Sequence, residues 1–136
     1  MKLDDKTLRK WINIISDDYM HWTKEQKKEI ILPMVRLCDC YIDPQERGII
    51  GWLTVTEIDC RLRTNVLVFY VKPEYRGSSL FLEMVHKVEE FAKEEGAIEI
   101  IIGGSCSGYK EEQFNRIFEH FGYTASGWRK KIWQQE

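Results

Sequence analysis

Apolar positions in the first part of the chain repeat with the period of a helix. Five of them fall on one helical face, at steps of three and four residues: Leu8, Trp11, Ile12, Ile15 and Tyr19. This spacing predicts an amphipathic helix, and either Asp4 or Asp5 can cap its first turn.

A second helix is expected soon after the first. Thr23 and Gln26 stand three residues apart and match a capping box, in which each side chain accepts a hydrogen bond from the other residue's backbone N–H. We expect this helix to run to about Leu32, because Pro33 lacks the N–H that a helix interior needs. Its lysines are expected to form a solvated face: Lys24, Lys27 and Lys28.

The middle of the chain is rich in β-branched and aromatic residues, which favour strands. Three such runs are residues 37–42, 49–58 and 62–71, and the segment DPQERG at 43–48 has turn chemistry. Because the links between these runs are short, we expect three antiparallel strands in a meander.

A long helix and a short strand are expected next. Between Ser79 and Glu95 the apolar residues form one helical stripe, and Gly96 is suited to end the helix. Residues 98–102 are strongly apolar, so we expect a central strand that is buried on both faces. The order strand, helix, strand indicates a right-handed crossover with parallel pairing.

The last segment predicts one more helix and a hairpin. Apolar residues at 114, 117, 118 and 121 share a helical face that Gly122 closes, and 123–133 offers a hairpin around Ser126 and Gly127. The whole order predicts an α/β (α+β) fold. Its single mixed sheet combines an antiparallel meander with a β-α-β crossover, and helices cover both faces.

Composition and charge limit the classes of function. The 136 residues fit a single domain, 1–136, and 43% hydrophobic residues are enough for a core. A net charge of −2 argues against general nucleic-acid binding, and no apolar stretch is long enough to span a membrane. The first ten residues, MKLDDKTLRK, carry acids where a signal peptide has a basic and then an apolar run. We therefore expect a soluble cytoplasmic protein.

The cysteines do not match a metal site. Cys38 and Cys40 are separated by one residue, while Cys60 and Cys106 stand apart. Zinc sites of the finger type need ligands paired at C-x-x-C or a similar spacing. An even count also permits disulfides, but nothing points to a secreted protein. We expect reduced thiols and no bound metal.

The segment VKPEYRGSS, from Val71 to Ser79, is the most informative for function. It joins a predicted strand to a predicted helix, so unpaired N–H groups and the helix dipole meet there. Gly77 lets the backbone approach a ligand, Ser78 can cap the helix or bind a phosphate, and Arg76 adds positive charge. The segment is either an anion site or a plain capped turn.

Three segments, in this order, resemble the GNAT superfamily of acetyl-CoA-dependent N-acetyltransferases. They are YVKPEYRGSSLFLEMV (Tyr70 to Val85), FAKEEGAIEIIIG (Phe91 to Gly103) and FNRIFEHFGYTASGWRKKIW (Phe114 to Trp133). The resemblance covers about residues 37–133. The short stretch before the meander is most similar to phage-borne members, which implies the cytoplasm of a bacterial cell or of a phage-infected host.

The resemblance implies acetyl-CoA as the co-substrate and indicates where it would bind. The family's pyrophosphate pattern, Arg/Gln-x-x-Gly-x-Gly/Ala, falls on six consecutive residues: Arg76, Gly77, Ser78, Ser79, Leu80 and Phe81. By the same resemblance, the backbones of Phe69 and Val71 would flank the pantetheine arm. An N–H near Val71 would polarise the thioester carbonyl.

Four positions depart from the family pattern. Ser79 and Phe81 stand where the family prefers glycine or another small residue, although Phe81 can turn into the core. Phe118 aligns with a tyrosine that often protonates the leaving thiolate, and Asn65 aligns near a glutamate that serves some members as base. We expect Phe118 to face the cofactor cleft, where Phe118→Tyr would supply the missing hydroxyl.

Other residues could supply the chemistry, or could be structural. Tyr109 or Tyr123 could protonate the thiolate, and Cys106 could lie near the CoA sulfur or be an ordinary loop thiol. Trp22 and Trp52 could line an acceptor groove or belong to the core. A base can act through water. The candidate catalytic residues are Glu57, Asp59 and Tyr70.

Two classes of function fit these observations. The first is an N-acetyltransferase that moves an acetyl group from acetyl-CoA to a primary amine on a small molecule, a peptide or a protein. The second is a catalytically silent GNAT-fold binding module or a host- or virion-associated interaction protein, which the residues at 65 and 118 favour. Trp128 and Trp133, beside the basic run 129–131, could mark a partner surface or a homodimer interface.

Overall fold

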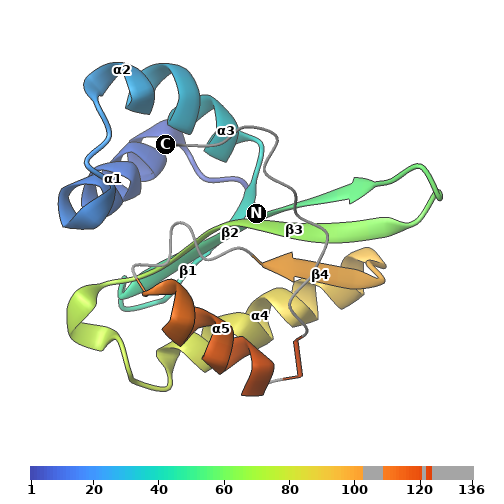
Figure 1. The fold of residues 1–136 in the computed structure, drawn as a ribbon. Helices are drawn as coiled ribbons and strands as arrows, with labels where there is room; N and C mark the ends of the chain where they lie inside the picture. The colour runs from blue at the N-terminus through green and yellow to red at the C-terminus, as the bar shows by residue number, and fades with distance from the viewer. Residues whose placement is uncertain (103–108, 121, 124–136) are drawn as a thin grey trace, which may run out of the picture.

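In the described part of the chain, a four-stranded sheet separates two layers of helices (Figure 1). The computed structural model describes residues 1–102, 109–120 and 122–123. The strands stand side by side in chain order: β1 (Asp39–Ile42), β2 (Gly48–Thr56), β3 (Leu62–Val71) and β4 (Glu99–Ile102). The first three strands pair antiparallel, and β3 pairs parallel with β4. This confirms the predicted mixed sheet.

The first helical layer covers one face of the sheet. Its elements are α1 (Asp5–Ile15), the π-helical turn η1 (Ser16–Met20), α2 (Lys24–Gln26), the π-helical turn η2 (Lys27–Ile31) and α3 (Leu32–Arg36). Asp4 caps α1, since its side chain accepts the Thr7 N–H at 2.8 Å. The capping box between Thr23 and Gln26 is also present, as predicted.

The prediction that the second helix ends near Leu32 was wrong. Helical turns continue through Pro33 to Arg36. In η2 the hydrogen bonds span five residues, and the last of them joins the Leu32 N–H to the Lys27 carbonyl. Pro33 therefore falls where the hydrogen-bond pattern changes and α3 begins, a position at which the missing N–H costs little.

The second helical layer covers the opposite face and consists of α4 (Leu80–Glu95) and α5 (Glu111–His120) (Figure 1). A short 3-10 turn, η3 (Pro73–Tyr75), leads from β3 into α4. Gly96 ends α4 at φ +84°, a left-handed conformation that glycine adopts without strain. The predicted stripe of α4 is buried at six positions: Leu80, Phe81, Met84, Val85, Val88 and Ala92.

Two hydrophobic cores result, one on each side of the sheet. Successive side chains of a strand point to opposite faces. Val68 and Tyr70 of β3 therefore pack in the core under α1 and α3, while Phe69 and Val71 pack in the core under α4 and α5.

The prediction that 98–102 forms a strand buried on both faces was wrong, because Ile98 is 41% and Ile101 is 42% exposed. Within the described residues β4 has β3 as its neighbour, and its central place in the sheet stays a prediction. The apolar composition of a segment does not indicate how many segments will cover it in the fold. The predicted hairpin at 123–133 lies outside the described residues except for Tyr123. In the part of the chain that is described, no helix is both long and apolar enough to cross a membrane.

Candidate functional site

A β-bulge interrupts the pairing of β3 with β2. Gly51 pairs with Val68 and Trp52 pairs with Val66, so Leu67 is an extra residue on β3. On the other side, β4 pairs with β3 only as far as Val66. Beyond the bulge, β3 continues with no described strand beside it on the β4 side, and we call this side of β3 the opening. A bulge also increases the local twist of the strand at this point.

Main-chain groups of β3 point into this opening. The Lys72 N–H donates to the Arg47 carbonyl at 2.9 Å, so the backbone groups of Lys72 face β2. Backbone groups alternate in direction along a strand. The N–H and carbonyl groups of Val71 and Phe69 therefore face away from β2, toward the opening. These are the two residues for which the sequence resemblance implied contact with a pantetheine arm.

The turn after β3 has an exposed backbone. Gly77 has φ +85°, and a Cβ built on it would have no atom within 4 Å. The Ser78 hydroxyl donates to the Tyr75 carbonyl at 2.6 Å and accepts the Leu80 N–H at 3.3 Å. The next N–H groups, in the first turn of α4, have no carbonyl partner within the helix. An anion can reach them from the open side of Gly77, with the helix dipole in its favour.

The bulky residue at the start of α4 does not cover the turn. Phe81 is buried in the core under α4 and α5, where its ring lies 4.6 Å from that of Phe69 and 5.3 Å from that of Phe118. The expectation that Phe81 turns into the core is therefore confirmed. The residues of the turn, together with the main chain of β3, fit an extended ligand that carries a pyrophosphate.

Arg76 connects the turn to the first helical layer. Its Nε donates to the Val71 carbonyl at 2.9 Å, and its Nη2 donates to Oδ2 of Asp18 at 2.6 Å. The same Oδ2 accepts the Tyr70 hydroxyl at 2.9 Å. Burial opposes ionisation of Asp18, but the hydrogen bonds from Arg76 and Tyr70 outweigh it and hold the pKa of Asp18 below its usual value.

Asp18 was missed in the sequence analysis. It lies three residues after Ile15, on the stripe that faces the sheet, where an apolar residue is expected. A carboxylate on a buried stripe needs a partner, and this break in the apolar pattern was the available signal.

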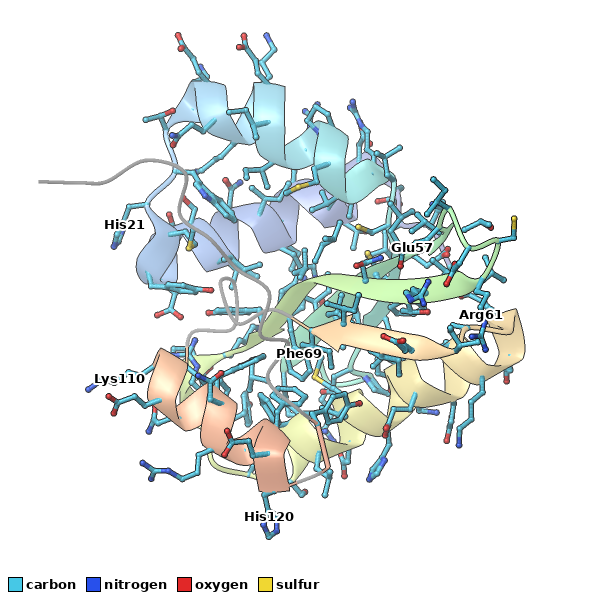
Figure 2. All side chains as sticks on the ribbon, turned by 45° about the vertical axis from the view of Figure 1, so that its right-hand side comes forward. His21, Glu57, Arg61, Phe69, Lys110 and His120 are labelled. Atoms are coloured by element: carbon cyan, nitrogen blue, oxygen red, sulfur yellow. The ribbon has the colours of Figure 1, made fainter. Side chains whose placement is uncertain are left out.

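The structure does not bring Glu57 and Asp59 to the opening. Both lie at the β2–β3 turn, at the far end of the hairpin from Val71; Figure 2 labels Glu57 and Arg61 there. Asp59 accepts two hydrogen bonds from Arg63, at 3.0 and 2.9 Å, and Glu57 is 3.2 Å from the same guanidinium. The hydrogen bond from Arg63 lowers the pKa of Asp59, which makes it a weaker base.

Tyr70 lies close to the opening but is held as a neutral phenol. Its side chain is buried, and its hydroxyl donates to Asp18. Burial and the hydrogen bond to the Asp18 carboxylate both raise the pKa of Tyr70. At neutral pH it is protonated, so it is a poor candidate for the base.

The two tyrosines considered as proton donors occupy different places. The ring of Tyr109 packs against Phe81 at 5.0 Å, and its hydroxyl is hydrogen-bonded to the Gly77 backbone. Burial raises the pKa of Tyr109. The Tyr123 hydroxyl instead donates to Glu89 of α4 at 3.1 Å. Of the two, Tyr109 is the one at the turn.

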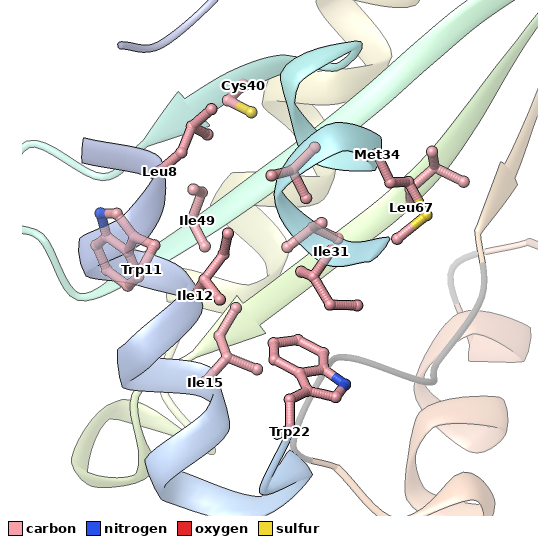
Figure 3. A pocket seen from close by; sticks show the side chains of 12 residues that line it. Leu8, Trp11, Ile12, Ile15, Trp22, Ile31, Met34, Cys40, Ile49 and Leu67 are labelled. Atoms are coloured by element: carbon pink, nitrogen blue, oxygen red, sulfur yellow. The ribbon is translucent and has the colours of Figure 1, made fainter. Parts of the chain in front are cut away.

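The two tryptophans proposed for an acceptor groove lie on opposite faces of the sheet. Trp52 is a core residue: it stacks on Phe91, and its indole N–H donates to Glu95 at 3.2 Å. Trp22 borders a cavity of about 40 Å³ between α1, α3 and the sheet (Figure 3). Leu67 of the bulge also lines this cavity. Cys106, Trp128 and Trp133 lie outside the described residues.

Comparison with known proteins identifies the family. The model of the acetyltransferase (GNAT) family matches residues 8–130. The chain belongs to this family. No curated protein gives a significant sequence match to this GNAT chain. In the part of the chain that is described, no three His, Cys, Asp or Glu side chains are placed to hold a metal ion.

Solved structures show the same GNAT fold at low sequence identity. An acetyltransferase from Trypanosoma brucei has a TM-score of 0.70 at 16% identity, covering 98% of this chain and 97% of its own. A ribosomal-protein-alanine N-acetyltransferase from Brucella melitensis biovar Abortus 2308 has a TM-score of 0.71 at 12% identity, covering 98% and 96%. AAC(6')-Iy, in complex with the bisubstrate analogue CoA-S-monomethyl-acetylneamine, has a TM-score of 0.70 at 11% identity, covering 100% and 96%.

Phe118 differs from the expectation derived from the GNAT pattern. It is 6% exposed and lies among aromatic rings of both helices and the sheet. Its ring centroid is within 6.3 Å of four others: Phe69, Phe81, Phe114 and Tyr123. The expectation that Phe118 faces an open cleft was wrong, because its side chain lies in the core under α4 and α5.

Gly77→Ala should weaken CoA binding and should cost about as much stability as Gly96→Ala, because both residues have a positive φ that strains an L side chain. In Gly77→Ala the new Cβ enters the space through which an anion reaches the turn, so we expect CoA affinity to fall at least about tenfold. Gly96→Ala is the matched control, because Gly96 has nearly the same φ but lies at the far end of α4. Calorimetric titration with CoA, with melting curves for both variants, checks this. Equal affinities for the two variants would contradict it.

Phe118→Tyr should destabilise the protein and should not raise turnover. A hydroxyl added among packed rings is buried without a partner, which costs about 1–3 kcal/mol and lowers Tm by roughly 3–10 °C in a chain of this size. Phe91→Tyr adds the same oxygen to a half-buried ring and should change Tm little. Scanning calorimetry and rate measurements distinguish the cases. An unchanged Tm with faster turnover would place the new hydroxyl in the opening.

Proposed function

We propose that this chain is an acetyl-CoA-dependent N-acetyltransferase that acetylates a primary amine. The observation that carries the proposal is the bulge at Leu67, beyond which the main chain of β3 faces the opening beside the Gly77 turn. A thioester held in the opening would lie along the main chain of Phe69 and Val71, where the Val71 N–H faces it and the Val71 carbonyl is already bonded to Arg76. Its pyrophosphate would lie at the Gly77 turn.

The residues of the site act mainly by positioning. Main-chain N–H groups of β3 are fixed by the sheet, so they can stabilise charge on a carbonyl oxygen without rearranging. Holding the amine and the thioester in contact converts a bimolecular step into a local one. The neutral amine attacks the thioester carbon, the tetrahedral adduct collapses, and the C–S bond breaks to release the thiolate and the amide.

Proton transfer in this proposal passes through water. Glu57 and Asp59 are ion-paired away from the opening, and Tyr70 is protonated. A water molecule can accept the proton of the attacking amine and carry it to solvent. The thiolate can likewise be protonated by water, because Phe118 has no proton to give.

The proposal is tested by incubating acetyl-CoA with primary amines of different classes. The panel comprises small alkylamines, amino acids, peptides with free N-termini, and lysine peptides with a blocked N-terminus. Thiol release and the mass of the acetylated product are measured, with reactions that lack the protein or the amine as negative controls. We expect product with at least one class. Binding of CoA with no product from any class would favour the catalytically silent module, and absence of CoA binding would refute the acetyltransferase.

Single changes at the three candidate catalytic residues should each leave appreciable turnover. The variants are Glu57→Gln, Asp59→Asn and Tyr70→Phe. A dedicated acid or base contributes typically a factor of about 10²–10⁴. If water carries the proton, each variant should stay within roughly tenfold of the native rate, measured at saturating acetyl-CoA. A loss beyond about a thousandfold in one variant, with its melting curve unchanged, would instead identify a proton-transfer residue.

A further inference from the structure

Asp18 is held toward the sheet by the geometry of η1. The Ser16 carbonyl accepts the His21 N–H at 2.8 Å, and the Ser16 hydroxyl accepts the Trp22 N–H at 2.9 Å. His21 then leaves the turn with a positive φ of 49°. π-helical turns occur frequently at functional sites, and this one places a carboxylate on the inward face. Asp18 therefore has little freedom to leave the sheet.

One carboxylate oxygen joins three parts of the molecule. Oδ2 of Asp18, in the first helical layer, accepts from Tyr70 of β3 and from Arg76 of the turn. The side chains of Asp18 and Arg76 are only 22% and 21% exposed. A pair in this setting is less screened than a surface ion pair. The guanidinium also lies 5.4 Å from the centre of the Tyr70 ring, so ring and carboxylate together restrict it.

Arg76 in turn fixes the path of the backbone. Its Nε bond to the Val71 carbonyl closes a loop from the end of β3 to the residue before Gly77. A guanidinium has five N–H donors, and the bonds to Val71 and Asp18 use two of them. The remaining donors can bind an anion while the two existing bonds are kept.

We propose that Asp18 is a positioning residue for the cofactor: it holds Arg76 so that the remaining donors of Arg76 and the N–H groups of the Gly77 turn receive the pyrophosphate of CoA together. This inference rests on the proposed function, because it takes CoA as the ligand of the turn. The competing explanation is that Asp18 only fastens η1 to β3. That explanation predicts a general loss of stability or of activity, with no preference for ligands that carry a pyrophosphate.

The experiment compares two acetyl donors that differ in the pyrophosphate. Acetyl-CoA carries it, and S-acetylpantetheine lacks it. For Asp18→Asn we expect KM for acetyl-CoA and Kd for CoA to rise roughly tenfold, the effect of losing one charge-assisted hydrogen bond. The value of kcat/KM for S-acetylpantetheine should stay at the native level. Asp17→Asn, which removes the same charge from the exposed neighbour on η1, should change neither.

A mutant cycle shows whether Asp18 acts through Arg76. If it does, Asp18→Asn should have no further effect on CoA affinity in an Arg76→Gln background. Asp18→Glu keeps the charge and replaces Asp18→Asn in the experiment if the asparagine variant does not fold. It should show a smaller loss of CoA affinity, again with acetyl-CoA affected and S-acetylpantetheine unaffected.

Three outcomes would overturn the inference while leaving the proposed function intact. These are native CoA affinity in Asp18→Asn, equal losses with both donors, and additive effects of the two substitutions. Failure of the native protein to bind CoA would overturn the proposed function and this inference together, so the two failures are distinguishable.

Discussion

The extra residue in β3 is the constraint on which the rest of the site depends. Up to Val66, β3 is an ordinary strand with a partner on each side; at Leu67 the register with β2 slips by one residue, and the described pairing with β4 ends at Val66. Beyond this point the N–H groups of Phe69 and Val71 face a side of β3 that has no described strand partner. Unpaired backbone groups are costly when buried, and an extended ligand that pairs with them removes that cost. The bulge thus marks the place where the proposed ligand would pair with β3.

The two helical layers support this opening in different ways. The core between the sheet and the layer of α4 and α5 is packed with aromatic rings, and those of Phe69, Phe81 and Phe118 lie within 6.3 Å of one another. The layer of α1 to α3 contributes a carboxylate instead, because Asp18 accepts hydrogen bonds from Tyr70 and Arg76. One face therefore makes the site rigid, and the other orients the cation beside the turn.

The sequence predicted the elements well and the partners of each element less well. The bounds of β3, the caps at Asp4 and Thr23, and the end of α4 at Gly96 follow from local periodicity and local hydrogen bonds. The exposure of β4 depends on which segments lie beside it, which periodicity does not record. Glu57 and Asp59 were considered because they end a strand, but Arg63, on the next strand, pairs with both.

The same distinction holds for the site. The Gly77 turn could be located from the sequence because its residue types match a local backbone requirement. Asp18 bonds to a residue 58 positions away, so in the sequence it was visible only as a polar residue that interrupts an apolar stripe.

The aromatic core also bears on how the proposed reaction could proceed without an acid at position 118. A thiol has a pKa near 8.5, so a thiolate is a far better leaving group at neutral pH than an alkoxide or an amide anion. Protonation of the departing sulfur is therefore a modest requirement that water can meet. Rigid packing under the opening is the more demanding requirement, because main-chain donors stabilise charge only if they are held in place. Phe118 serves that second requirement: its ring fills the core beneath the strand whose N–H groups face the opening.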